Sequence, residues 1–348
     1  MNEDITEKRL ISDLIKTSSS IEKRIVFSDG DDIRLVKALD YLKDFNKSQF
    51  ILIGNEKKIA DNIKESQVKN KDIYNIIDPA KSNKKEEHCE IVINSFKKRN
   101  KDITPGEIDE ILLNTSYLAA IMLKNDEADC AVGGSISSTE ALMKAVINVL
   151  GLVKGKKYLS GAAFIEVPEC IYGLNGRFVI ADPAIIPHPT QEQLLDITLS
   201  TYETAKAFLG EIPYVALLSY STKGSANSEE INKIRNVVEM ARQIKPEIII
   251  DGEMQFDAAI VPEVCQIKAP QSPLKGRSNV LIFPDLNAAN ISYKIFQRIG
   301  NATVCGTIVQ GALKPFNDLS RGCLVKDIIA LITMTLLQTK GMEDSSLI

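Results

Sequence analysis

The sequence predicts an α/β protein whose parallel strands are covered by helices on both faces. Short runs of β-branched and other apolar residues recur along the chain, and each is followed by a longer segment with the periodicity of an amphipathic helix. Strands that are apolar throughout belong to sheets buried on both faces, as in parallel α/β folds. The length of 348 residues, at about 150 residues per domain, predicts two domains.

The first four predicted strands each precede a helix. These strands are RIVFS (24–28), FILIG (50–54), YNIID (74–78) and DCAVGG (129–134). Apolar residues at the spacing of one helix face follow the first strand, and charged amphipathic segments follow the next two. STEALMKAVINVLG follows the fourth. The repeated unit predicts parallel pairing.

The pattern changes between residues 152 and 182. Asn175-Gly176 suits a two-residue hairpin turn, so antiparallel pairing is expected in this stretch. The polar run Lys154-Gly155-Lys156-Lys157 predicts a domain boundary near residue 155.

The alternation resumes in the second half of the chain. Further strands are expected at YVALLS (214–219), EIIID (247–251) and VLIFPD (280–285). An apolar strand is expected to end at Gly306, before a polar loop and an apolar helix over residues 325–337.

Composition excludes several classes of protein. The chain has two histidines, His88 and His188, so a multi-histidine metal centre cannot form within one chain. Neither histidine lies near a convincing nucleophile, and both are expected to be surface or capping residues. The formal charge of −4, with lysine clusters interleaved with acids, does not indicate nucleic-acid binding.

The cysteines and the apolar segments predict a cytoplasmic protein. The six cysteines form no CxxC pair, which argues against a zinc ribbon, and they are too few for a disulfide scaffold, so reduced thiols are expected. The N-terminal residues lack the pattern of a signal peptide. The most apolar long stretch, 328–337, is too short to span a bilayer.

Residues 129–140, DCAVGGSISSTE, combine a strand end, two glycines and the start of a helix. Backbone N–H groups in such a segment bind phosphate, and Lys144 follows about one and a half turns later. The alternative is an ordinary helix cap made by Ser137, Ser138 or Thr139. Residues alone leave both interpretations open, with capping favoured.

Two further strand ends carry polar side chains. SYSTKGSA (219–226) is compatible with a ligand loop or a plain turn. Asp251, Glu253 and Asp257 suggest a magnesium site, although carboxylates near a helix start more often act as caps. In GTIVQGALKPFNDLSRGC (306–323) a polar loop leads into the apolar helix that carries Asp327, where capping is again the alternative.

Six motifs together resemble the phosphate acetyltransferase (phosphotransacetylase) family, within the phosphate acetyl/butyryltransferases. They come in family order along almost the whole chain. They are RIVFSDGDDIR (24–34), GGSISST (133–139), YVALLSYSTKGSA (214–226), DGEMQFDAAIVPEV (251–264), NVLIFPDLNAANISYKIFQR (279–298) and VQGALKPFNDLSRGC (309–323).

The resemblance implies the reaction acetyl-CoA plus phosphate giving acetyl phosphate plus CoA, reversibly. It implies two doubly wound α/β domains with a cleft between them, like isocitrate and isopropylmalate dehydrogenases. The expected domains are residues 1–155 with 308–348, and residues 156–307. Coenzyme A and acetyl-CoA are substrates, and neither a tightly bound cofactor nor a metal is expected. A homodimer is expected, with metabolic coupling to acetate kinase.

Ser320, Arg321 and Asp327 match the family's active-site serine, arginine and aspartate. The CoA thiol has a pKa near ~8.5, so a general base increases its reactive thiolate fraction. Asp327 is the expected base, and burial in its apolar helix would raise its pKa. Ser320 is expected to stabilise the developing oxyanion, and Arg321 to hold phosphate.

The resemblance also implies residues that bind the substrates. The expected phosphate and acyl site comprises Gly134, Ser135, Ser138, Thr139, Tyr293, Lys294, Gln310 and Asn317; Gln310 and Asn317 are expected to order the loop. CoA phosphates are assigned to Lys144 and to Lys98 or Arg99. Lys144 stands where the family usually has arginine, which predicts weaker CoA affinity.

Other departures from the family pattern bear on which acyl chain the enzyme prefers and not on the type of reaction. Ser28-Asp29-Gly30 replaces the usual Pro-Glu-Gly, Thr307 replaces a proline, and AIIPHPT (184–190) replaces an asparagine-containing stretch. The alternatives are a butyryl or other short-chain acyl preference and a non-catalytic CoA- or acetyl-phosphate-binding homologue. A dehydrogenase is disfavoured because no GxGxxG follows an early strand.

Overall fold

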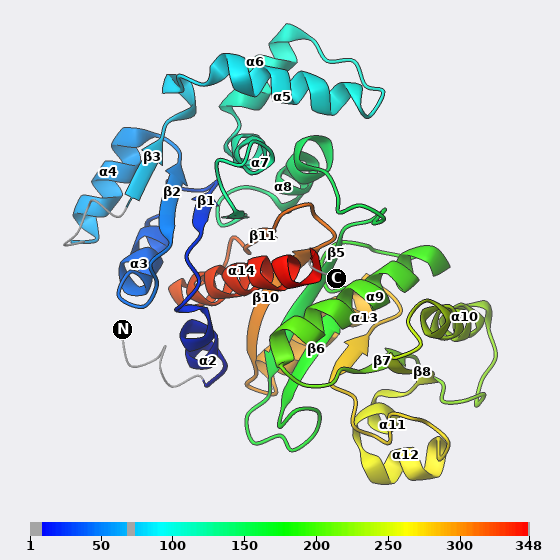
Figure 1. Cartoon of the computed structure of the whole chain (residues 1–348). Helices are drawn as coiled ribbons and strands as arrows, with labels where there is room; N and C mark the ends of the chain where they lie inside the picture. Colours follow the sequence, from blue (N-terminus) through cyan, green and yellow to red (C-terminus); the bar gives the residue numbers. More distant parts are fainter. Residues whose placement is uncertain (1–8, 68–73, 347–348) are drawn as a thin grey trace. The chain divides into compact units, whose positions relative to one another are not determined.

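The structure, a computed structural model, describes residues 9–67 and 74–346 (Figure 1). The chain divides into two compact units. Unit 1 comprises residues 1–155 and 312–348, and unit 2 comprises residues 156–311. We expected the chain to re-enter the first domain at residue 308, but it re-enters unit 1 at residue 312. Residue 308 lies inside a strand of unit 2. That the chain folds as two independent domains with boundaries at 155 and 308 remains a prediction.

Unit 1 contains a parallel sheet in the order β11-β4-β1-β2-β3. Its strands are β1 (Arg24–Phe27), β2 (Gln49–Ile53), β3 (Tyr74–Ile77), β4 (Cys130–Gly133) and β11 (Phe316–Asp318). The four strands and the parallel pairing predicted for this half of the chain are confirmed. β11 was not predicted, because three residues within a polar loop carry no periodic signal.

The helices of unit 1 come from both ends of the sequence. They are α2 (Arg9–Ser18), α3 (Ile33–Leu42), α4 (Glu56–Glu65), η1 (Pro79–Lys81), α5 (Lys85–Lys97), α6 (Pro105–Leu113), α7 (Thr115–Lys124), α8 (Thr139–Ala145), η2 (Val146–Leu150) and α14 (Val325–Ser346). α14, red in Figure 1, packs against α2, α3 and β4, while α7 contacts β2 and β4. The C-terminal apolar helix is therefore a core element of unit 1.

Unit 2 contains a mixed sheet in the order β10-β5-β6-β9-β7-β8. Its strands are β5 (Ser160–Glu166), β6 (Arg177–Ala181), β7 (Tyr214–Leu218), β8 (Ile249–Met254), β9 (Val280–Ile282) and β10 (Thr303–Gln310). Its helices are α9 (Gln191–Leu209), α10 (Glu229–Ile244), α11 (Phe256–Ile260), α12 (Pro262–Lys268) and α13 (Leu286–Arg298). The run β6-β9-β7-β8 is parallel.

The antiparallel pairing predicted for residues 152–182 is confirmed by β5 and β6. Leu174 and Arg177 exchange two backbone hydrogen bonds, at 3.1 and 3.2 Å, around the Asn175-Gly176 turn. Both turn residues have positive φ, 49° and 85°, which Asn and Gly tolerate best.

The strand expected to end at Gly306 continues to Gln310, so that prediction is wrong. Its pairing with β5 shifts register between Cys305 and Ile308. Gly306, with φ of 97°, permits this irregularity and does not terminate the strand.

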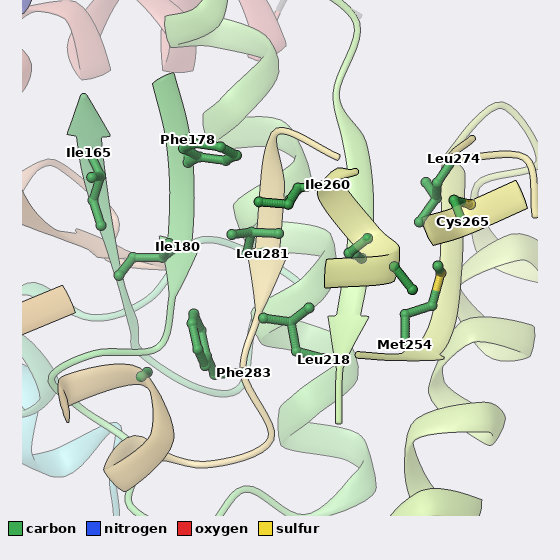
Figure 2. Close-up of a cluster of buried hydrophobic side chains, with 14 of the residues drawn as sticks. Ile165, Phe178, Ile180, Leu218, Met254, Ile260, Cys265, Leu274, Leu281 and Phe283 are labelled. Atoms are coloured by element: carbon green, nitrogen blue, oxygen red, sulfur yellow. The ribbon is translucent and has the colours of Figure 1, made fainter. Parts of the chain in front are cut away.

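The core of unit 2 is formed by apolar side chains from neighbouring strands and the helices above them. Figure 2 shows Ile260 of α11 beside Phe178 of β6 and Leu281 of β9, and Cys265 of α12 beside Leu274. Each of these side chains is less than a tenth exposed, so the strands present a continuous apolar face.

The structure bears on two expectations from the composition, the surface position of His88 and the free state of the cysteine thiols. His88 is only 3% exposed and shares a hydrogen bond of 2.9 Å with Glu127, so its assignment to the surface or a cap is wrong. All six cysteines have free thiols. No helix within residues 9–67 and 74–346 combines the length and the apolar character that crossing a bilayer requires.

Candidate active site

The candidate site lies at the carboxyl ends of three adjacent strands of unit 1. The chain continues from β1 to β2 and β3 on one side, whereas β4 and β11 lie on the other. The strand order therefore reverses between β1 and β4, the place where α/β sheets bind ligands. The segments that follow β1, β4 and β11 meet there, and they contain residues 28–34, 134–139 and 319–324.

Arg34 joins these three segments. Its Nη1 donates to the main-chain oxygens of Arg321 and Cys323, at 2.9 and 2.8 Å. Its Nη2 donates to the main-chain oxygen of Ser135 at 2.9 Å and to Asp32 Oδ2 at 2.7 Å. One guanidinium thus fixes the backbone at Arg321 and Cys323, within the segment that carries the candidate catalytic residues.

Asp32 holds the Arg34 side chain in place. Asp32 is 5% exposed, caps α3, and accepts the Arg34 main-chain N–H at 2.9 Å. Burial alone would raise the pKa of Asp32, but hydrogen bonds from Arg34 and Ser135 outweigh burial and keep that pKa below its usual range. The carboxylate therefore stays charged and keeps Arg34 oriented.

Asp29 fastens the serine-rich segment to the end of β1. Its Oδ2 accepts the N–H groups of Ile136 at 3.1 Å and of Ser137 at 3.4 Å, while Oδ1 accepts the Ser137 hydroxyl at 2.5 Å. Two backbone donors of the kind expected to bind phosphate are thus used internally. Ser138 caps α8 by accepting the Ala141 N–H at 3.2 Å, as the capping alternative proposed.

The segment after β4 is also joined to the loop that carries Ser320 and Arg321. Thr139 Oγ1 donates to Asp318 Oδ2 at 2.5 Å, and the Leu319 N–H donates to the Gly133 oxygen at 2.7 Å. Burial, with a smaller contribution from the charge of Asp29, raises the pKa of Asp318 to about 6. Gly134, at φ of 87°, lies directly against the Asp318 carboxyl group.

Ser320, Arg321 and Asp327 follow β11 on one exposed loop and the first turn of α14. Ser320 and Arg321 are exposed, and Ser320 Oγ accepts the Gly322 N–H at 3.3 Å. Asp327 is half-buried, and its Oδ2 accepts the Leu324 N–H at 2.9 Å. Asp327 thus makes the helix-start contact weighed as the alternative, and one carboxylate oxygen is fixed by it.

Two amides expected to order the loop have different surroundings. Asn317 is wholly buried in unit 1 and donates to Thr335 at 2.8 Å and Gln338 at 2.9 Å, both on α14. Gln310 lies in unit 2, where it accepts from Ser160 at 2.9 Å and donates to Thr204 at 2.7 Å. Asn317 therefore ties β11 to α14, while Gln310 ties β10 to its own sheet and to α9.

The candidate CoA-binding cations are near the helix formed by α8 and η2. Arg99 Nη1 donates to the Ile147 oxygen at 2.9 Å, three residues beyond Lys144. Lys144 pairs with Glu140 at 2.8 Å on the exposed helix surface. Residues three apart on a helix are neighbours, so Arg99 and Lys144 lie in the same region. Lys98 is the C-terminal cap of α5.

Tyr293 and Lys294 lie on α13 of unit 2. Lys294 Nζ donates to the Tyr293 hydroxyl at 2.8 Å and lies 4.6 Å from the centre of its ring. The two side chains thus present one phenol and one ammonium group together.

The three carboxylates considered for magnesium pair with separate bases of unit 2. Asp251 pairs with Lys223 at 2.9 Å, and Asp257 with Lys268 at 2.7 Å. Burial would raise the pKa of Glu253, but Arg235 and the Gly224 N–H lower it to about 2. Within the described residues no three metal-ligating side chains form a group. The 219–226 loop instead folds around Glu253.

Four side chains at this site were not assigned a role from the sequence: Asp29, Asp32, Arg34 and Asp318. Asp32 two residues before Arg34, at the start of a helix, is a recognisable capping signal. The contacts of Arg34 with the segments after β4 and β11 bridge 101 and up to 289 positions, and no local pattern encodes such distances.

Comparisons with known proteins agree with this fold. A family model described as "Phosphate acetyl/butaryl transferase" matches residues 9–336. The phosphate acetyltransferase of Thermoanaerobacterium thermosaccharolyticum is 39% identical over 331 residues, covering 95% of this chain and 99% of the relative.

Two solved structures illustrate the fold. A phosphotransacetylase from Streptococcus pyogenes superposes with a TM-score of 0.87 at 33% identity, covering 95% of this chain and 98% of the other. 4-Hydroxythreonine-4-phosphate dehydrogenase from Klebsiella pneumoniae has a TM-score of 0.51 at 10% identity, covering 91% and 99%. The second likeness concerns the fold alone, and it agrees with the dehydrogenase-like architecture expected.

The match over most of the chain, the high-coverage relatives and the site at the β1–β4 reversal lead to one assignment. The chain belongs to the phosphate acetyl/butaryl transferase family and is an acyl-transferring enzyme of the phosphate acetyltransferase class.

Proposed function

We propose that this enzyme interconverts acetyl-CoA plus phosphate and acetyl phosphate plus CoA. The observation that carries the proposal is the exposed Ser320-Arg321 pair, whose backbone Arg34 anchors beside the serine-rich segment. A guanidinium there offers two parallel donors to phosphate oxygens, and a neighbouring hydroxyl offers a donor to an acyl oxygen.

In the direction of acetyl-CoA formation, the CoA sulfur attacks the carbonyl carbon of acetyl phosphate. Asp327 accepts the thiol proton at Oδ1, while Oδ2 keeps the hydrogen bond from Leu324 that orients the carboxylate. The carbon–oxygen bond to phosphate then breaks, and Arg321 stabilises the departing phosphate. Ser320 donates to the carbonyl oxygen while it carries negative charge.

No covalent enzyme intermediate is needed in this scheme. Holding both substrates in one ternary complex supplies the rate advantage, because it converts a bimolecular step into an effectively unimolecular one. The reverse reaction uses the same groups: phosphate attacks the thioester, and the CoA thiolate takes its proton back from Asp327.

The residues expected from the sequence to bind phosphate and the acyl group are assigned as follows. Within unit 1 we assign phosphate and acyl contacts to Gly134, Ser135, Ser138 and Thr139. Tyr293 and Lys294 are the substrate-binding candidates of unit 2, where Gln310 instead orders β10 through Ser160 and Thr204. Asn317 acts by holding β11 on α14, since its amide is engaged there.

The CoA phosphates are assigned to Lys144 and Arg99. The Arg99–Ile147 bond places Arg99 beside the helix of Lys144 and favours it over Lys98. Because lysine lacks the fork of arginine, Lys144→Arg should lower the KM for CoA. An unchanged KM would remove Lys144 from the CoA site.

Release of free CoA thiol from acetyl-CoA, dependent on phosphate or arsenate, tests the reaction directly. Acetyl-CoA should turn over faster than propionyl-CoA or butyryl-CoA, because relatives that are 36–39% identical over most of the chain are named phosphate acetyltransferase. Preference for butyryl-CoA would support the butyryl alternative. Binding without turnover would support a non-catalytic homologue.

We further propose a cytoplasmic homodimer whose acetyl phosphate is consumed by acetate kinase. Ile291 and Ile295 of α13 and Ile299 at its C-terminal cap are 58%, 50% and 83% exposed and follow one another at four-residue spacing. Residues at this spacing share one helix face, and such an exposed apolar stripe is typical of an interface. A second copy of the chain is the occupant that we assign to it.

A further inference from the structure

Asp318 is a buried carboxyl group in the catalytic loop that the proposed chemistry does not use. It is the last residue of β11 and stands two positions before Ser320. Its Oδ2 accepts the Thr139 hydroxyl at 2.5 Å, whereas its Oδ1 is buried and has no hydrogen-bond partner within the described part of the chain.

The backbone around Asp318 leaves little room for rearrangement. Asp318 is opposite Gly133 in the parallel pairing of β11 and β4, and the next N–H, of Leu319, donates to the Gly133 oxygen. A Cβ atom on Gly134 would overlap Asp318 Oδ1 and lie 2.6 Å from the Leu319 oxygen. Glycine at 134 is therefore what allows the carboxyl group to lie against this segment.

Stability does not account for this carboxyl group. Burying an oxygen without a partner costs free energy, and the raised pKa of Asp318 reflects that cost. An amide or a small apolar side chain could occupy the position without a buried charge. A buried, incompletely satisfied group beside the proposed reaction site calls for a functional explanation.

We propose that Asp318 is a positioning residue, which holds Thr139 and the start of α8 at a fixed distance from Ser320 and Arg321. The proposal rests on the proposed function and adds to it a second link, independent of Arg34, between the segment after β4 and the catalytic loop. Because small displacements of reacting groups lower turnover strongly, loss of this link should reduce kcat.

The experiment compares Asp318→Ala, Thr139→Val and the double variant by phosphate-dependent turnover of acetyl-CoA. Each single variant should lower kcat about tenfold or more. The KM for CoA should change less than about threefold, because the link lies away from the proposed Lys144 and Arg99 contacts. The double variant should be no slower than the slower single variant, since both remove one hydrogen bond.

Conservative variants separate positioning from general damage. Thr139→Ser keeps the hydroxyl and should recover most of the kcat lost in Thr139→Val. Asp318→Asn keeps an acceptor oxygen and should be faster than Asp318→Ala; it also serves if the alanine variant fails to fold. Asn46→Ala removes a buried amide that donates to Ser18 and Ile21, and it should lower stability without lowering kcat.

Two results would overturn the proposal. If the wild-type enzyme is active, either of two outcomes refutes the positioning role without refuting the proposed function. One is a kcat of Asp318→Ala within about twofold of wild type, and the other is a double variant in which the two single losses multiply. Absence of phosphate-dependent turnover in the wild-type protein refutes the proposed function, and the positioning role with it. The wild-type measurement therefore distinguishes the two failures.

Discussion

The Nη1 atom of Arg34 donates a hydrogen bond of 2.9 Å to the main-chain oxygen of Arg321, across 287 positions of the sequence. The same guanidinium reaches Ser135 and is held by the buried carboxylate of Asp32. Arg34 contacts the backbone of the proposed site and not the proposed reacting groups, so we infer that it is a positioning residue.

Replacing Arg34 by lysine should lower kcat about tenfold to a hundredfold, because one ammonium cannot reproduce bonds to three segments. Stability should fall by about 1–3 kcal/mol, since Asp32 loses hydrogen bonds at a buried site. Steady-state kinetics and urea unfolding measure both effects. Arg24→Lys is the matched control, because Arg24 pairs with Asp129 at the opposite end of β1. The control should lose stability but keep kcat; equal loss of kcat in both variants would contradict the assignment.

Arg321→Gln should raise the KM for phosphate and lower kcat, because the amide keeps polarity but loses the charge and the two parallel donors. The KM for CoA should change much less. Arg9→Gln, on the exposed start of α2, serves as the control for loss of one positive charge. Near-normal phosphate kinetics in Arg321→Gln would remove this residue from the mechanism.

Asp327→Asn should lower turnover about 10²- to 10⁴-fold, the range typical of a lost general base. Raising the pH should partly restore the rate, because a larger fraction of CoA is then thiolate without help from the enzyme. Rates of thiol release across a pH series test this. Asp126→Asn, an exposed partner of Lys314, should behave like wild type. An unaffected Asp327→Asn enzyme would mean that another group takes the proton.

The stability of the protein should depend on pH through Asp318. The pKa of Asp318 is raised from its ordinary 3.8 to about 6 in the folded state. At pH values between these two pKa values, the folded state binds more protons than the unfolded state. The free energy of unfolding therefore falls as the pH rises through this range.

Asp318→Asn lacks this titration and should therefore be more stable than wild type above pH 7, by up to about 3 kcal/mol. The advantage should shrink below pH 5, where the wild-type carboxyl group is protonated when folded. Denaturant unfolding of both proteins from pH 4 to pH 8 provides the comparison. A difference that stays constant across this range would show that the carboxyl group is not desolvated by folding.

Ile295→Glu should weaken self-association, because a charge would be buried in the interface proposed on α13. Sedimentation of the two proteins over a range of concentrations measures the change. Ile171→Glu is the control, since Ile171 is 79% exposed in a loop outside α13. A variant that remains dimeric would place the interface elsewhere, and a monomeric wild type would refute the dimer itself.

The strands were predictable where the chain repeats a local pattern. RIVFS, FILIG and YVALLS are apolar, bounded by polar residues and followed by helices, so their existence and parallel pairing followed from periodicity. The hairpin turn was predictable from the dipeptide Asn175-Gly176, because Asn and Gly tolerate the positive φ angles of such turns. By contrast, Gly306 suggested a strand end because glycine weakens strands, but pairing of β10 with β5 on both sides of it overrides that preference.

The proposed catalytic residues match a sequence motif of the family, whereas the contacts that support them have no such motif. Ser320, Arg321 and Asp327 lie within eight consecutive positions, so their spacing is visible in the sequence. Asp29, Arg34 and Asp318 act on segments about a hundred or more positions away, and only the folded sheet brings those segments together. His88 looked like a surface residue on a charged helix, but Glu127 partners it in the interior.

The pairing of β11 with β4 has a consequence for biosynthesis. Unit 1 receives its last strand and α14 only after all of unit 2 has left the ribosome, since residues 156–311 intervene. At about 5–20 residues per second, the edge of β4 and the apolar surface that later contacts α14 stay uncovered for many seconds. During that interval the nascent chain presents an unpaired strand edge, a surface that molecular chaperones recognise, and the loop with Ser320 and Arg321 cannot take its place before the interval ends.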